Sequence, residues 1–244
     1  MIRVTVWNEN VHERTEEKIK AIYPKGIHGC IADFLGEDKD IQVTTATLDM
    51  PECGLTDEVL NNTDVLIWWA HCYHKDVPDE LVEKIHDRIL RGMGFIALHS
   101  AHYSKIFKKL IGQTGSLSWR DNNFERVWNI LPSHPITRGI PEYFELEKEE
   151  MYGEPFDIPQ PDELIFIGWF DGGEVFRSGC TWHKKNGKVF YFQPGHEAYP
   201  IYYNKTIQTI INNAVHWAAP TRITPPIECP HVPVSPEEKR KGGK

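Results

Sequence analysis

The sequence predicts an α/β domain built on a mostly parallel sheet with helices on both faces. Three observations point to this class. Short apolar runs alternate with amphipathic segments through the first half of the chain. These runs are continuous, as in strands that are covered on both faces. Hairpin-type glycine turns appear only in the later half, so some antiparallel structure is expected there.

The first half of the chain contains four predicted strands with helices between them. Apolar runs predict strands at residues 2–7, 41–47, 65–69 and 95–98. Helical periodicity predicts helices at 15–22, 27–35, 79–92 and around 106–111, with Thr56 as the N-cap of a further short helix. In the helix over 79–92 the apolar residues fall on one face, and Gly92 supplies a C-terminal stop.

The second half predicts further strands at 126–131, 163–169, 174–182 and 189–192, joined in part by turns at 172–173 and 186–187. An amphipathic helix over 206–218 closes the domain. The acidic, proline-rich segment 142–161 predicts a long loop, in which Glu147 and Glu149 are expected in solvent. We therefore expect one domain over residues 1–219. The tail 220–244 cannot build a core, and we expect it to lie along the surface or fray.

Composition and charge exclude several classes of partner. The formal net charge of -8 and a pI near 5.8 leave no basic patch for nucleic acid or an anionic membrane. No apolar stretch approaches the roughly 20 residues that span a bilayer, and no secretory signal is visible. Five cysteines without paired spacing predict reduced thiols and a cytoplasmic protein. The acidic loop and the tail are the candidate contacts of a homo-oligomer.

Three histidine-bearing segments each follow an apolar run directly. They carry His71 and His74, then His99 and His102, and then His196 with Glu197. Parallel strands deliver their following loops to one edge of the sheet, where ligands bind in open α/β folds. The sequence therefore predicts a histidine-rich cleft. GxGxxG and P-loop motifs are absent from the sequence, so we expect no nucleotide cofactor.

The candidate catalytic residues are His99, His196 and Glu150. His99 and Ser100 occupy a strand-to-helix turn, where Ser100 as a nucleophile is a weaker alternative because the flanking glycines of a nucleophile elbow are missing. Glu197 beside His196 resembles a base with its orienting carboxylate. Glu150 lies next to Tyr152 and is the acidic residue of its segment best placed for burial.

Two interpretations of the histidines remain open. In the first, a subset of His71, His74, His99 and His196 binds a divalent metal such as zinc. In the second, the cluster recognises hydroxyl groups by hydrogen bonding. We expect the remaining polar residues near the strand ends to bind substrate: Asn8, Glu9, His28, His102, Tyr152 and Glu197.

Several separated motifs, in order, make the chain similar to the ThuA-like family, which is named for trehalose utilisation. They are GIHG at 26–29, VLIWWAHCYH at 65–74, GMGFIALHSAHYSKIFKKLIG at 92–112, HPITRGI at 134–140, EEMYGEPFDIP at 149–159 and VFYFQPGHEAYP at 189–200. The resemblance spans nearly all of residues 1–219. It implies a flavodoxin-like fold shared with class I glutamine amidotransferases. At the turn where those enzymes carry a nucleophilic Cys this sequence has His99 and Ser100, so we expect no glutamine hydrolysis.

The resemblance also implies a function in carbohydrate utilisation. Its substrate would be a small sugar such as trehalose or a keto-sugar, bound in the histidine-rich cleft by a hydrolase, lyase or isomerase. A neutral keto-sugar suits a site whose His, Glu and Tyr residues can transfer protons. The alternative is a non-catalytic sugar-binding or regulatory module on an amidotransferase-like scaffold.

Overall fold

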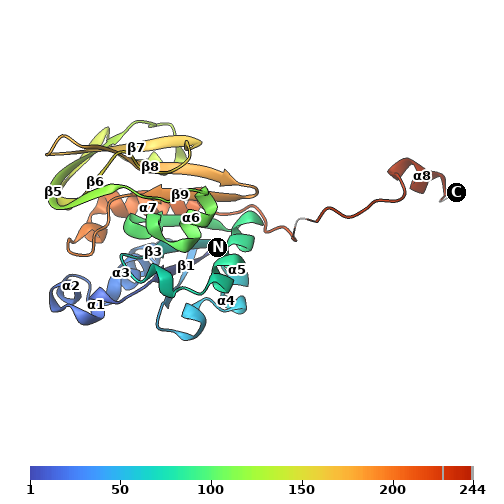
Figure 1. The fold of residues 1–244 in the computed structure, drawn as a ribbon, viewed down its shortest axis with the longest axis horizontal. Helices are drawn as coiled ribbons and strands as arrows, with labels where there is room; N and C mark the ends of the chain where they lie inside the picture. The colour runs from blue at the N-terminus through green and yellow to red at the C-terminus, as the bar shows by residue number, and fades with distance from the viewer. Residues whose placement is uncertain (227, 243–244) are drawn as a thin grey trace.

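The protein is built around one nine-stranded mixed sheet, seen in a computed structural model that describes residues 1–226 and 228–242 (Figure 1). The strand order is β2-β1-β3-β4-β9-β8-β7-β5-β6. The first five strands in this order are parallel, and the pairs from β9 to β6 are antiparallel. This arrangement confirms the predicted fold class.

The parallel strands are short and almost entirely buried where they form the centre of the sheet. They are β1 (Ile2–Asn8), β2 (Ile41–Thr47), β3 (Val65–Trp69), β4 (Gly94–Leu98) and β9 (Gly187–Phe192). Every residue of β3 and β4 is buried, because helices cover both faces. Alternate side chains point to opposite faces, so Trp68 stacks on Trp7 in one core cluster while Trp69 packs in the other.

The antiparallel strands form the other part of the sheet, at the top of Figure 1. They are β5 (Ser118–Asn129), β6 (Tyr143–Gly153), β7 (Glu163–Phe170) and β8 (Val175–Lys184). The prediction of a loop over residues 142–161 is therefore wrong for the first part of that segment. This part forms strand β6, which pairs with β5. The first residues of β6 alternate between exposed and buried, whereas its last five residues are all buried.

Helices cover both faces of the parallel part. One core cluster contains the apolar residues of α3 and α7, and the other contains those of α4, α5 and α6. The predicted helix over 15–22 is instead two short helices, because Glu16 has an extended backbone (φ -118°, ψ 110°) that separates them. The helix bounds are α1 His12–Thr15, α2 Glu17–Ile22, α3 Gly26–Leu35, α4 Asp57–Asn61, α5 Asp79–Leu90, α6 Lys105–Ile111, α7 Lys205–Ala218 and α8 Pro236–Lys241.

Short 3-10 helices occupy several of the connections between strands and helices. Helix η2 (His74–Asp76) follows strand β3, and helix η3 (His99–Tyr103) follows strand β4. The remaining 3-10 helices are η1 (Pro51–Gly54), η4 (Pro135–Thr137) and η5 (Ile201–Tyr203). None of the described helices has the length and apolar character needed to cross a membrane.

The C-terminal tail leaves the domain after a single anchored segment. The amide of Thr224 donates to the carbonyl of Arg91, which ties the start of the tail to the end of α5. Beyond it the chain extends away from the domain and carries the short helix α8, which has no buried residues (Figure 1). Ser235 and Glu238 form a capping box at the start of that helix.

Candidate functional site

The candidate site lies where the carboxyl ends of the parallel strands meet strand β6. The loop after β3 supplies His71, the turn after β4 supplies His99, and the loop after β9 supplies His196. The imidazole centroids of His99 and His71 lie 5.3 and 5.1 Å from that of His196. Strand β6 places Glu150 against this group from the antiparallel side.

His99 and Glu150 form a buried ion pair. Nε2 of His99 is 3.0 Å from Oε2 of Glu150, and both side chains are almost completely buried. Nδ1 of His99 lies 2.9 Å from the carbonyl oxygen of Gln193, which can only accept, so Nδ1 carries a proton. Burial lowers the pKa of His99, but pairing with Glu150 outweighs it and raises that pKa above its usual value. Burial likewise raises the pKa of Glu150, but pairing with His99 lowers it overall.

The backbone at His99 has the left-handed conformation, with φ at 53°. Non-glycine residues adopt this conformation at a cost of order 1–3 kcal/mol, and such residues cluster at functional turns. The imidazole ring stacks on Tyr152 at a centroid distance of 5.0 Å and an interplanar angle of 14°. The contact with the Gln193 carbonyl and the stacking on Tyr152 hold the ring in this position.

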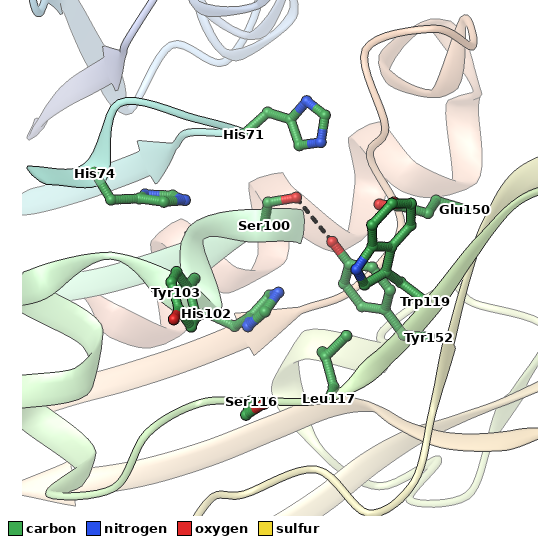
Figure 2. A pocket seen from close by; sticks show the side chains of 10 residues that line it. All are labelled: His71, His74, Ser100, His102, Tyr103, Ser116, Leu117, Trp119, Glu150 and Tyr152. Atoms are coloured by element: carbon green, nitrogen blue, oxygen red, sulfur yellow. Dashed lines mark hydrogen bonds between the residues drawn. The ribbon is translucent and has the colours of Figure 1, made fainter.

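Ser100 pairs with a phenol. Its Oγ lies 2.8 Å from the hydroxyl of Tyr152 (Figure 2). Burial raises the pKa of Tyr152 well above its usual value, so the phenol stays neutral. A neutral phenol is a poor general base, and this contact gives Ser100 no activation as a nucleophile.

Glu149 holds the turn that presents His196. Its carboxylate accepts hydrogen bonds from the amides of Gly195 (2.8 Å), His196 (3.1 Å) and Glu150 (2.8 Å). The expectation that Glu149 is solvated is therefore wrong, since its side chain is fully buried. Only Glu147 of that pair is exposed. Burial is the main reason that the pKa of Glu149 is raised to about 7.

His196 offers a proton donor to the site. The amide of Ala198 donates to Nδ1 of His196 at 3.0 Å, so the neutral ring carries its proton on Nε2. Burial and the neighbouring His99 lower the pKa of His196 to about 4, which keeps the ring neutral near pH 7.

Glu197 joins two further histidines. Its Oε1 is 2.8 Å from Nδ1 of His12 and also contacts Nδ1 of His71. Burial lowers the pKa of His71, but the hydrogen bond and charge of Glu197 outweigh it and raise that pKa to about 9. Burial raises the pKa of Glu197, but the two histidines hold it well below its usual range. The site therefore contains two clusters in which a carboxylate pairs with imidazoles. In one, Glu150 pairs with His99, and in the other, Glu197 pairs with His12 and His71.

A cavity of about 410 Å³ opens beside these groups. Figure 2 shows His71, His74 and Ser100 on one side, and Trp119, Tyr152 and Glu150 on another. Among the described residues that line it, none is a lysine or an arginine. The lining residues are His71, His74, Ser100, His102, Tyr103, Ser116, Leu117, Trp119, Glu150 and Tyr152.

Comparison with known families identifies the relatives of this chain. The family model described as ThuA, trehalose utilisation, matches residues 3–218. The chain belongs to the ThuA family. A search of the curated proteins finds none that matches it significantly.

Solved structures share the fold of this ThuA-family protein at low sequence identity. A ThuA-like protein from Parabacteroides merdae is 13% identical, with a TM-score of 0.64 over 93% of this chain and 92% of that one. A cytoplasmic protein from Salmonella typhimurium LT2 is 13% identical, with a TM-score of 0.57 over 89% and 100%. A glutamine amidotransferase from Thermotoga maritima is 12% identical, with a TM-score of 0.51 over 88% and 97%. These likenesses confirm the amidotransferase-like fold.

Three groups of side chains in the described part of this ThuA-family protein could hold a metal ion. They are His71 with Glu150 and His196, His12 with His71 and Glu197, and Glu9 with His12 and Cys72. In each group the candidate ligand atoms lie within 4.8 Å of one another. Of the four predicted histidine ligands, His71 and His196 share a group, whereas His74 and His99 belong to none of the three.

The other predicted site residues divide between the cavity and its surroundings. His102 and Tyr152 line the cavity, and Nδ1 of His102 is 2.6 Å from the carbonyl oxygen of Gly115. Asn8 and His28 contact each other at 3.1 Å but do not line it. Glu9 is completely buried and bonds Cys72, which follows β3.

Sequence reasoning missed two residues of the site. His12 follows the end of β1 by four positions and His71 follows the end of β3 by two, so the same argument from strand ends would have found His12. Gln193 orients His99 through its backbone carbonyl, and no pattern of residue types signals such a contact.

Proposed function

We propose that this ThuA-family protein is an enzyme of carbohydrate utilisation that transforms a neutral sugar or keto-sugar by proton transfer. The observation that carries the proposal is the buried pair of His99 and Glu150 beside a cavity lined by hydroxyl, imidazole and aromatic groups. Such walls suit a polyhydroxylated ligand, and the lack of lysine and arginine in the lining disfavours an anionic one.

Glu150 is the proposed general base. The 3.0 Å contact with His99 engages Oε2, which is buried, so the other carboxylate oxygen is the one proposed to accept the proton. In a keto-sugar, Glu150 removes the proton from the carbon next to the carbonyl, and the electron pair of that C–H bond forms an enolate. His99 is the positioning residue that holds the carboxylate charged until then.

His196 is the proposed general acid. Its Nε2 proton is available because Nδ1 is occupied by the amide of Ala198. The neutral ring donates this proton to the enolate oxygen as charge develops there. Glu150, whose acquired proton exchanges with solvent, then protonates the adjacent carbon in an isomerisation or a departing oxygen in an elimination, and the ring takes its Nε2 proton back from the enol. Trp119 and Tyr103, both about half exposed or more, lie in the cavity wall and offer ring faces to a sugar.

A second candidate function is carried by the clustering of His71, Glu150 and His196, whose two nitrogens and one oxygen suit zinc. A divalent ion held there would polarise a substrate carbonyl. Nδ1 of His196 accepts a hydrogen bond from the amide of Ala198, so Nε2 carries the proton. An ion could bind either nitrogen of this ring only if the contact with Ala198 changed. Elemental analysis of the purified protein, with activity before and after EDTA, separates metal-assisted catalysis from the metal-free reaction.

The test of the proposed function is turnover on a panel of trehalose, maltose and their 3-keto forms. We expect the wild type to consume one keto-sugar, and Glu150→Gln and His196→Ala to lose about 10²- to 10⁴-fold in kcat. Glu147→Gln, an exposed change on the same strand, is the matched control. Binding without turnover of every sugar would favour a binding or regulatory module, and turnover that survives both site variants removes our assignment.

We also place this protein in the cytoplasm, with a small sugar as its ligand. The net charge of -8 argues against nucleic acid and anionic membranes. The Salmonella protein of similar fold, described as cytoplasmic, supports the location.

A further inference from the structure

Glu9, His12 and Cys72 form a compact cluster next to the proposed active site. Glu9 follows strand β1, His12 begins helix α1, and Cys72 lies in the loop after β3. Sγ of Cys72 is 3.1 Å from Oε1 of Glu9 and 3.6 Å from Nε2 of His12. None of the three lines the cavity described above, and the proposed reaction assigns none of them a role.

The spacing of these atoms matches that of metal ligands. Zinc bonds of roughly 2.0 Å to nitrogen and 2.3 Å to sulfur, in tetrahedral geometry, place the two ligands about 3.5 Å apart. The measured separation of Sγ and Nε2 is 3.6 Å. Oε1 of Glu9 lies 3.1 Å from Sγ of Cys72, a few tenths of an ångström closer than this geometry requires. A small rotation of either side chain would restore the spacing.

The surroundings hold each ligand in place. The amide of Cys72 donates to Oε2 of Glu9 at 2.7 Å, which leaves Oε1 facing the thiol and His12. Nδ1 of His12 is 2.8 Å from Glu197, so Nδ1 carries the proton and Nε2 is free to bind. A metal-binding histidine typically makes this contact, with its second nitrogen donating to a carboxylate.

The local charges favour a cation over a free thiolate. Glu9 is fully buried and Glu197 is 2% exposed, and Oε2 of Glu197 makes no hydrogen bond within the described residues. Two carboxylates beside Cys72 repel a thiolate, so the thiol is a poor nucleophile although a Cys, His and Glu are aligned. A divalent cation would neutralise these charges and allow the thiol to ionise.

We propose that Glu9, His12 and Cys72 bind one zinc ion, or a divalent ion of similar affinity for sulfur. His12 and Cys72 are partly exposed, which provides an entry path and leaves the fourth ligand position open to water. This site is separate from the group of His71, Glu150 and His196, and it does not depend on the proposed sugar chemistry.

Cobalt substitution tests the proposal without any assay of activity. Protein freed of metal by a chelator is titrated with Co²⁺, and absorption is followed in the near ultraviolet, where thiolate ligands give a charge-transfer band. We expect one equivalent of Co²⁺ to produce this band in the wild type, in Glu150→Gln and in Cys229→Ser. Cys72→Ser should lose the band, and His12→Ala should bind Zn²⁺ at least about 10-fold more weakly.

Several results would overturn the proposal. They are a wild type without the band, a band that persists in Cys72→Ser, or a band lost in Glu150→Gln but kept in Cys72→Ser. Should Cys72→Ser fail to fold, Zn²⁺ protection of Cys72 from alkylation decides the question in the folded Cys229→Ser protein. Mass spectrometry should show alkylation of Cys72 slowed at least about 10-fold by Zn²⁺, and an unchanged rate contradicts the site.

Discussion

Replacing Glu149 by Gln should destabilise the protein and displace the turn that carries His196. In the best orientation the amide oxygen of Gln still accepts from Glu150 and His196, while its NH₂ group faces the amide of Gly195. One hydrogen bond to a charged group is lost, worth about 1.5–3 kcal/mol, and two buried donors are left facing each other. The two remaining bonds also lose their charge assistance.

One effect opposes this loss. The raised pKa of Glu149, about 7, shows that burial of its charge is itself unfavourable, and Gln removes that charge. The net decrease in the free energy of unfolding is therefore smaller than the loss from the hydrogen bonds alone, about 1–2 kcal/mol near pH 7. Urea denaturation measures it as a lower midpoint with an unchanged m-value. Glu147→Gln on the same strand should change stability by less than about 0.5 kcal/mol. A Glu149→Gln protein as stable as this control would refute the assigned role of Glu149.

Three further changes probe the turn, the cavity and a distant ion pair. Gly195→Ala should destabilise the protein by about 1–3 kcal/mol in the same denaturation assay. The backbone φ of Gly195 is +149°, and the new methyl group would overlap the hydroxyl of Tyr202, so a variant of wild-type stability would contradict this packing. Trp119→Ala should raise KM for the sugar with little change in kcat or stability, since the ring is 65% exposed at the cavity wall; a fall in kcat alone would show a different role. Asp38→Asn should cost up to about 1 kcal/mol at pH 7, because hydrogen bonds from His216 and a backbone amide lower the pKa of Asp38 to about 2. A carboxylate with a lowered pKa stabilises the fold above its unfolded pKa, so the difference from wild type should shrink as the pH falls from about 4 toward 2. A difference independent of pH would contradict the role of these hydrogen bonds to the carboxylate.

The sequence predicted the parallel part of the sheet because its signals are local. Runs such as residues 65–69 are apolar throughout, and the structure buries all of them. Because parallel strands present their following loops at one edge, the sequence also predicted that His71, His99 and His196 lie together there. Strand β6 was missed because its acidic residues and the prolines that follow it are typical of loops, although Phe144 and Leu146 alternate with exposed neighbours.

Residues whose role depends on long-range contacts could not be predicted. Glu149 is buried because the amides of Gly195 and His196, far along the chain, satisfy its carboxylate. Neither the local charge nor the periodicity of the sequence predicts these hydrogen bonds to Glu149. A glutamate in an acidic run is usually exposed to solvent. The protonated nitrogen of His99 similarly depends on a backbone carbonyl.

Proton exchange catalysed by Glu150 tests the proposed mechanism most directly. The 3-keto form of trehalose is incubated in D₂O, and proton NMR follows the signal of the hydrogen next to the carbonyl. We expect rapid loss of that signal with the wild type and with Glu147→Gln, and loss near the uncatalysed rate with folded Glu150→Gln. Exchange that persists in Glu150→Gln, or a wild type that binds the keto-sugar without exchange, would contradict the proposed proton transfer.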